Sequence, residues 1–166
     1  MAQGATASAP DMTDLVEARV ILEPELAAFC AQRATDRDLE ELGSLVEEMQ
    51  QAISERDRFV DCDLRFHVSI AVASQNHALA EYMKAIAAPL RKLIRNGSTT
   101  LEIRQLVHSQ HVHILRALEL HQASEARALM RTHLRTVERG YRLLQRPRKD
   151  KNVPLSPRGG AHAFHY

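Results

Sequence analysis

Apolar residues recur three and four positions apart along most of this chain, which is the spacing of one face of an α-helix. The pattern predicts six helices, over about residues 12–34, 35–54, 56–74, 78–96, 100–121 and 124–144. Pro24 lies within the first helix and should kink or split it, and Pro89 lies within the fourth and should bend it. Helices of this length with short connections form antiparallel bundles. We therefore expect an all-α bundle of six to seven helices.

The two ends of the chain lack this periodicity. Residues 1–11 are small and polar, and residues 146–166 combine prolines, a glycine pair and basic residues. Such segments bury too little apolar surface to fold, so we expect a disordered lead and a disordered basic tail. The helical domain then covers residues 12–145, which is long enough for a core with a central pocket.

The composition narrows the class of protein. Of 166 residues, 45% are apolar and 26% are charged, as in soluble globular domains. With 22 basic and 21 acidic residues, the formal charge of +1 argues against a free-standing nucleic-acid binder. No apolar run approaches the roughly 18 residues of a membrane span, and the first residues do not resemble a secretory signal. With only two cysteines, Cys30 and Cys62, the chain is predicted to be cytoplasmic.

Nine histidines stand out in this composition, because neutral imidazole is a common metal ligand. In the predicted third helix, Asp63 and His67 are four residues apart and share its apolar face. His111 lies on the apolar stripe of the fifth helix, and His133 lies on that of the sixth. Three helices thus point an acid or a histidine at the interior, where an unpaired charge is costly. One carboxylate and three imidazoles suit a first-row divalent metal, which would offset that cost.

Simpler interpretations of these residues stay open at this level. An inward histidine is often a hydrogen-bonded core residue, and an Asp–His pair four residues apart is often a surface pair. His108, His113 and His121 are interpreted as surface residues or as supports for the inward group.

Four stretches of the chain carry a family resemblance. They are Asp14–Arg19 followed by Leu22-Glu23-Pro24, Asp63-Leu-Arg-Phe-His67 followed by Asn76, His111–Leu118, and Ala126 followed by Met130-Arg-Thr-His-Leu134. In this combination the chain resembles the FadR-type C-terminal domain, FCD, of GntR-family transcription regulators. The resemblance spans about residues 12–144, the whole predicted helical domain.

The resemblance implies both a fold and a site. It implies an antiparallel helical bundle whose central pocket holds a divalent metal, zinc or nickel, on Asp63, His67, His111 and His133. It also implies that a small organic acid enters the pocket as the effector. Arg19 occupies the position of a family arginine that pairs with the effector carboxylate. The alternative for Arg19 is a structural salt bridge with a nearby glutamate.

One departure from the family bears on function. Family regulators place a winged helix-turn-helix before this domain, whereas about eleven residues precede the first predicted helix here. We therefore expect a sensor that is not an enzyme and does not bind DNA directly, and that acts as a homodimer or in a mixed dimer with a full-length regulator. The alternatives are a mononuclear metalloenzyme on the same bundle and a helical interaction module without metal.

Overall fold

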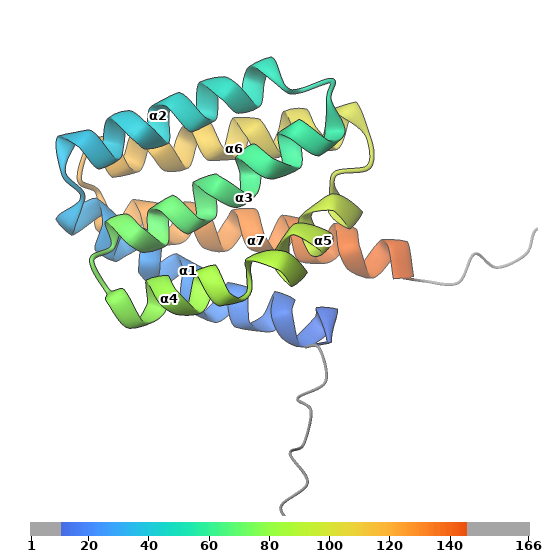
Figure 1. Ribbon diagram of the computed structural model, residues 1–166, viewed down its shortest axis with the longest axis horizontal. Coiled ribbons are helices and arrows are strands. Elements are labelled where there is room, and N and C mark those ends of the chain that lie inside the picture. The colour runs from blue at the N-terminus through green and yellow to red at the C-terminus, as the bar shows by residue number, and fades with distance from the viewer. Residues whose placement is uncertain (1–10, 146–166) are drawn as a thin grey trace, which may run out of the picture.

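The computed structural model describes residues 11–145, with side chains as far as residue 140, and every regular element in that range is a helix (Figure 1). Of the expected lead over residues 1–11, residues 1–10 lie outside the described residues, as does the expected tail from residue 146, whereas Asp11 is described as the N-cap of α1. The helices are α1 (Met12–Arg33), α2 (Asp36–Gln51), α3 (Arg56–Ala73), α4 (His77–Ala85), α5 (Ala87–Gly97), α6 (Leu101–Glu119) and α7 (Ala123–Gln145). The all-α class and the number of helices are confirmed.

Local capping explains where several helices begin. Thr35 and Asp38 form a reciprocal capping box at the start of α2, with Thr35 N donating to Asp38 Oδ2 at 2.8 Å. The hydroxyl of Thr100 accepts from the backbone N–H of Ile103 at the start of α6. Asp11 accepts from the N–H of Thr13 at the start of α1. Each cap satisfies an N–H that has no partner within its own helix.

The two interior prolines have different effects. The predicted helix over 78–96 is in fact two helices, α4 and α5, which break at Ile86. A continuous helix would bring the ring of Pro89 against the carbonyl of Ala85, whereas in the first turn of α5 its missing N–H needs no partner. Pro24, in contrast, does not split α1, which is continuous and packs along α7 and α3 with Pro24 buried.

Helices α1, α3, α6 and α7 enclose the interior of the bundle. α1 packs along α7 and α3, α6 packs on α7, and α2 covers α3 and α6 (Figure 1). Phe59, Phe66, Leu26, Met49 and Ile114 are among the fully buried side chains of the apolar core. None of the helices between residues 11 and 145 has the length and hydropathy needed to cross a bilayer. The buried polar residues described next come from α1, α3, α6 and α7.

Candidate metal centre and pocket

A cluster of buried polar side chains lies where these four helices face one another. None of its six members exposes more than 4% of its surface. All the residues predicted as site residues are among them, together with one glutamate that the sequence analysis did not assign to the site. They are Arg19 and Glu23 on α1, Asp63 and His67 on α3, His111 on α6 and His133 on α7.

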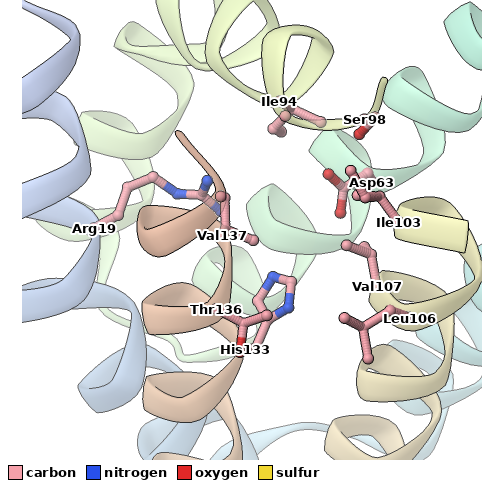
Figure 2. Close-up of a pocket in the computed structure, with 12 residues that line it drawn as sticks. Arg19, Asp63, Ile94, Ser98, Ile103, Leu106, Val107, His133, Thr136 and Val137 are labelled. Carbon is pink, nitrogen blue, oxygen red and sulfur yellow. The ribbon is translucent and has the colours of Figure 1, made fainter. Parts of the chain in front are cut away.

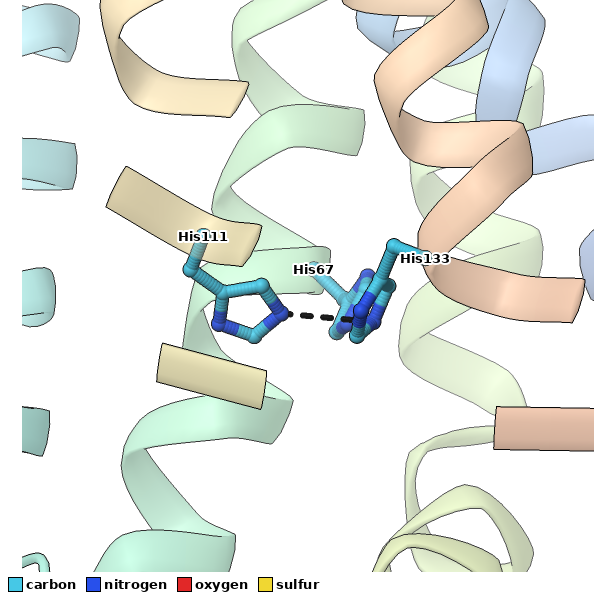
Figure 3. A group of neighbouring side chains, drawn as sticks. All are labelled: His67, His111 and His133. Carbon is cyan, nitrogen blue, oxygen red and sulfur yellow. Dashed lines mark hydrogen bonds between the residues drawn. The ribbon is translucent and has the colours of Figure 1, made fainter. Parts of the chain in front are cut away.

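Three histidines from three helices converge at the centre of this cluster (Figure 3). His67, His111 and His133 each offer one ring nitrogen, and these nitrogens all lie within 4.8 Å of one another. The Nε2 atoms of His111 and His133 are 3.3 Å apart. This spacing is small enough for one ion to contact all three rings, so the cluster could hold a metal ion.

Asp63 adds a carboxylate to the three histidines. Its Oδ1 lies 3.3 Å from Nε2 of His111 and 3.6 Å from Nε2 of His67. The ring of Phe66 stacks on His111 with 4.5 Å between the ring centroids, which restricts the orientation of that imidazole. The structure therefore brings all four predicted ligands together.

The outer nitrogen of His67 faces a second carboxylate. Its Nδ1 lies 2.6 Å from Oε2 of Glu23, in an ion-pair contact that is not aligned as a hydrogen bond. An ionised carboxylate can only accept a proton, so this contact favours the tautomer with hydrogen on Nδ1. The lone pair of Nε2 then points towards Asp63 and the cluster.

A relay of hydrogen bonds sets the tautomer of His133. The hydroxyl of Thr136 donates to the carbonyl of Thr132 at 2.9 Å, and it accepts from Nε2 of Gln110 at 3.4 Å. The carboxamide of Gln110 therefore turns its oxygen towards His133, whose Nδ1 lies 2.9 Å away. Because that oxygen only accepts, Nδ1 of His133 carries the hydrogen and its Nε2 carries the lone pair.

The third histidine has the same orientation. Nδ1 of His111 lies 3.3 Å from the sulfur of Met49, which has no hydrogen to donate and is a weak acceptor. This contact is favourable when Nδ1 carries the hydrogen, as it must when Nε2 binds a metal. Without a metal, a hydrogen on Nε2 has Nε2 of His133 and Oδ1 of Asp63 as acceptors, each 3.3 Å away. All three imidazoles are thus held from outside with Nε2 facing inwards, the arrangement by which outer partners orient metal-binding histidines.

Two inner atoms of the cluster lack the partners that buried polar atoms normally have. Oδ1 of Asp63 and Nε2 of His67 are both buried without a hydrogen bond. With the hydrogens of all three rings on Nδ1, three lone pairs and one carboxylate oxygen face one another, and they repel unless a cation lies between them. A divalent ion fits this donor set, because neutral imidazole and carboxylate are ligands of first-row divalent metals.

Burial and neighbouring charges shift the pKa values of the cluster. Burial, together with the adjacent His133, lowers the pKa of His111 well below its usual value. Burial and the nearby His67 do the same to the pKa of His133, so both rings are neutral. For His67, burial works against the charged form, but the carboxylates of Glu23 and Asp63 raise its pKa above the usual value. The raised pKa favours protonation of His67, so a proton and a metal ion compete for the same lone pair on its Nε2.

Arg19 and Glu23 form a buried ion pair beside the histidines. Nε of Arg19 lies 2.5 Å from Oε1 of Glu23, and Nη2 lies 3.5 Å from Oε2. Burial alone would raise the pKa of Glu23, but Arg19 and His67 hold it below its usual range. The structural salt bridge that was the alternative role of Arg19 is therefore present, and its partner is Glu23. Arg19 also lines the pocket. The sequence signal that identifies Glu23 in retrospect is its i, i+4 spacing from Arg19 on the buried face of α1.

A pocket of about 380 Å³ opens beside the cluster (Figure 2). This volume is in the range of small-molecule sites, roughly 300–1,000 Å³. Arg19, Asp63 and His133 reach into it from the cluster. The remaining lining residues come from α5, α6, α7 and the residue after α5: Ile94, Gly97, Ser98, Ile103, Leu106, Val107, Thr136, Val137 and Gly140.

The three other histidines on or near α6 lie apart from the centre. Nε2 of His108 lies 3.2 Å from the carbonyl of Val46, and Nδ1 of His121 lies 2.9 Å from the carbonyl of Ala31. His113 is exposed. His108 and His121 therefore connect neighbouring helices.

An all-α bundle with a buried histidine cluster beside a pocket is the architecture of a small-molecule-binding domain. The FCD domain family matches residues 14–136, and the chain belongs to this family, the effector-sensing domain of GntR-family transcription regulators. This match confirms the resemblance drawn from the motifs.

Relatives and solved structures agree with this assignment. The chain is 28% identical over 134 residues to the HTH-type transcriptional regulator LutR of Bacillus subtilis, covering 77% of this chain and 61% of LutR. It is 25% identical to the HTH-type transcriptional repressor NanR of Cronobacter sakazakii, covering 80% of this chain and 52% of NanR. The structure of Streptococcus agalactiae GntR superposes with a TM-score of 0.67 at 26% identity, covering 77% of this chain and 58% of that one. The chain thus spans little more than half the length of these relatives.

Proposed function

We propose that this domain is a metal-dependent sensor of a small organic acid in a GntR-family regulator. The observation that carries the proposal is the convergence of three inward imidazole nitrogens and Oδ1 of Asp63 next to the pocket. The relatives are named as transcription regulators, which favours a sensor over an enzyme.

In this proposal Asp63, His67, His111 and His133 hold one divalent ion, zinc or nickel. The ion would supply a Lewis-acidic positive charge that attracts a carboxylate. Glu23, Gln110 and Met49 keep the three rings oriented, so that little order is lost when a metal is taken up.

Arg19 is the second group proposed to bind the effector. Its contacts with Glu23 use Nε and Nη2, and its guanidinium also lines the pocket. The donors on Nη1 can therefore receive an effector carboxylate without breaking the buried ion pair. The effector would then be held between Arg19 and the metal centre.

Signalling follows from differential affinity. An effector that binds one arrangement of the bundle or dimer more tightly shifts the population towards it. We propose that the chain acts in the cytoplasm as a homodimer or in a mixed dimer with a full-length regulator. The nearly balanced charge of the chain, +1, supports an effector-reading role without direct contact to DNA.

Elemental analysis tests the metal centre. We expect about one equivalent of a transition metal per chain in the wild type, and none in Asp63→Ala or His133→Ala. His113→Ala is the matched control, because this exposed histidine on α6 lies outside the cluster. Added zinc or nickel should raise the melting temperature of the wild type and of the control only.

Two other outcomes would replace the proposal. No bound metal and no thermal response to metal would leave a helical interaction module with hydrogen-bonded core histidines. Turnover of a bound organic acid that is lost in His111→Ala would instead support the metalloenzyme alternative.

A further inference from the structure

The side chains that line the pocket indicate what kind of group the ligand carries besides its carboxylate. Five aliphatic side chains line the pocket, from three helices: Ile94 on α5, Ile103, Leu106 and Val107 on α6, and Val137 on α7. In Figure 2, Ile103, Leu106 and Val107 lie on the side of the pocket opposite Arg19. A ligand held by Arg19 would therefore extend along apolar surface.

The polar capacity of these walls is small. Among the lining residues whose side chains the structure describes, two carry hydroxyls, Ser98 and Thr136. The hydroxyl of Thr136 already donates to the carbonyl of Thr132 and accepts from Gln110. Within that described part of the wall, Ser98 therefore carries the one hydroxyl that these contacts leave available to a ligand. Each ligand hydroxyl that enters without a partner loses its hydrogen bonds to water, which is costly.

Covering one exposed apolar residue of the pocket wall with a ligand would also favour binding. Leu106 is 49% exposed, although its neighbour Val107 is 6% exposed. A ligand tail over Leu106 would remove apolar surface from water, which favours binding in proportion to the area covered. The pocket of about 380 Å³ is of the size of small-molecule sites, which is enough for a carboxylate with a tail of several carbons.

We infer that the effector is a monocarboxylic acid with an aliphatic tail, and not a polyhydroxy acid. The inference rests on the proposed function, since Arg19 and the metal centre bind the head group. Val107, Leu106 and Ile103 contact the tail. A second carboxylate or a series of hydroxyls would meet these side chains without a partner, and sites of this kind reject such ligands.

Isothermal titration of zinc-loaded protein tests the inference with defined probes. Butanoate, hexanoate and octanoate have tails of increasing length, and affinity should rise about fourfold for each added CH₂ group. Gluconate has the same number of carbons as hexanoate but carries five hydroxyls. We expect gluconate to bind at least tenfold more weakly than hexanoate. Equal or tighter binding of gluconate, or no gain with tail length, would overturn the inference.

A pair of matched variants assigns the effect to the pocket wall. Val107→Thr keeps the side-chain shape and adds a hydroxyl on the pocket side of α6, so it should reduce the preference for hexanoate over gluconate. Val112→Thr makes the same change at a position that is 41% exposed on α6, and it should change nothing. If Val107→Thr does not fold, Val137→Thr places the same hydroxyl on α7, at a half-buried wall position.

Measuring bound zinc in the same samples distinguishes a failure of the proposed metal site from a failure of the proposed ligand class. Bound zinc with a preference for gluconate would overturn the ligand class and leave the metal sensor intact. Absence of zinc together with absence of binding by any carboxylate would overturn both. Absence of zinc with tail-dependent carboxylate binding would overturn the metal requirement and leave the ligand class standing.

Discussion

Glu23 on α1 and His67 on α3 meet inside the bundle, with 2.6 Å between Oε2 of the glutamate and Nδ1 of the histidine. Glu23 also pairs with Arg19, which lines the pocket. One buried carboxylate thus contacts both a predicted metal ligand and the proposed effector-binding arginine. Through Glu23, a change at either site alters the electrostatic environment of the other.

Replacing Glu23 should weaken metal binding. In Glu23→Gln the carboxylate no longer orients His67 or increases the basicity of its Nε2. Loss of such an outer partner typically costs about 10–100-fold in metal affinity. Competition with a chromophoric zinc chelator measures the change directly.

Glu25→Gln is the matched control for this experiment. Glu25 lies on the same helix, and its side chain is 42% exposed and pairs with Arg127 on α7. Its removal should leave zinc affinity unchanged. Equal zinc affinities of Glu23→Gln and the wild type would show that Glu23 does not support the metal centre.

Zinc binding should depend on pH through one histidine. Because the carboxylates of Glu23 and Asp63 raise the pKa of His67 despite its burial, a proton competes with zinc for this ring as the pH falls. His111 and His133 have lowered pKa values and need lose no proton. Apparent zinc affinity should therefore fall about tenfold per pH unit below the pKa of His67 and level off above it.

Titrations between about pH 5.5 and 8.5 test this dependence on His67. In Glu23→Gln the pKa of His67 falls, so the pH at which affinity levels off should move downwards. A slope near three protons in the wild type would contradict the neutral state of His111 and His133.

The relay to His133 predicts a second, smaller effect on metal binding. Gln110→Leu removes the oxygen that accepts from Nδ1 of His133, so the tautomer of that ring is no longer set. We expect zinc affinity to fall by about tenfold. Gln105→Leu makes the same change at an exposed position of α6 and should have no effect. Unchanged zinc affinity in Gln110→Leu would show that the hydrogen bonds from Thr136 through Gln110 to His133 do not support metal binding.

Arg104 is predicted to stabilise the pocket wall without contacting the metal ligands. It is 7% exposed, and its Nε donates to the carbonyl of Ile53 at 2.6 Å while Nη1 donates to that of Ser98 at 3.2 Å. These carbonyls follow the C-terminal ends of α2 and α5, where a cation is favourable. Arg104→Met should lower the free energy of unfolding by about 2 kcal/mol in urea titrations.

Arg91→Met is the control for Arg104→Met. Arg91 is 39% exposed and pairs with Asp61 across α3 and α5, and exposed pairs contribute little to stability. We expect the two variants to differ clearly in their urea midpoints. Similar midpoints would show that the buried donors of Arg104 do not hold the two helix ends.

The amino-acid pattern was sufficient to predict most of the helices and the faces that they turn inwards. A period of three to four residues predicted six helices, of which five match α1, α2, α3, α6 and α7 and one covers both α4 and α5. The start of α2 followed from Thr35 and Asp38. The same period indicated which faces turn inwards, and the structure buries Asp63, His67 and His111 on those faces. These features are local, because a helix fixes the direction of each side chain relative to its own neighbours.

Other features depended on packing between helices. Pro24 and Pro89 each lie inside a stretch with helical periodicity, where proline is expected to interrupt the helix. Helix α1 is nevertheless continuous through Pro24, whereas α4 ends and α5 begins on either side of Ile86, before Pro89. The contact of Glu23 with His67 depends on how α1 and α3 lie against each other.

The sequence by itself therefore determined the helices, their inward faces and the family of this domain. Only the tertiary structure decided which partner each inward side chain meets, including the outer contacts of the three histidines and the aliphatic wall of the pocket. The reason is physical: periodicity defines rotation about one helix axis, whereas contacts between helices also depend on their relative rotation, shift and crossing angle, which the packing of the whole core sets.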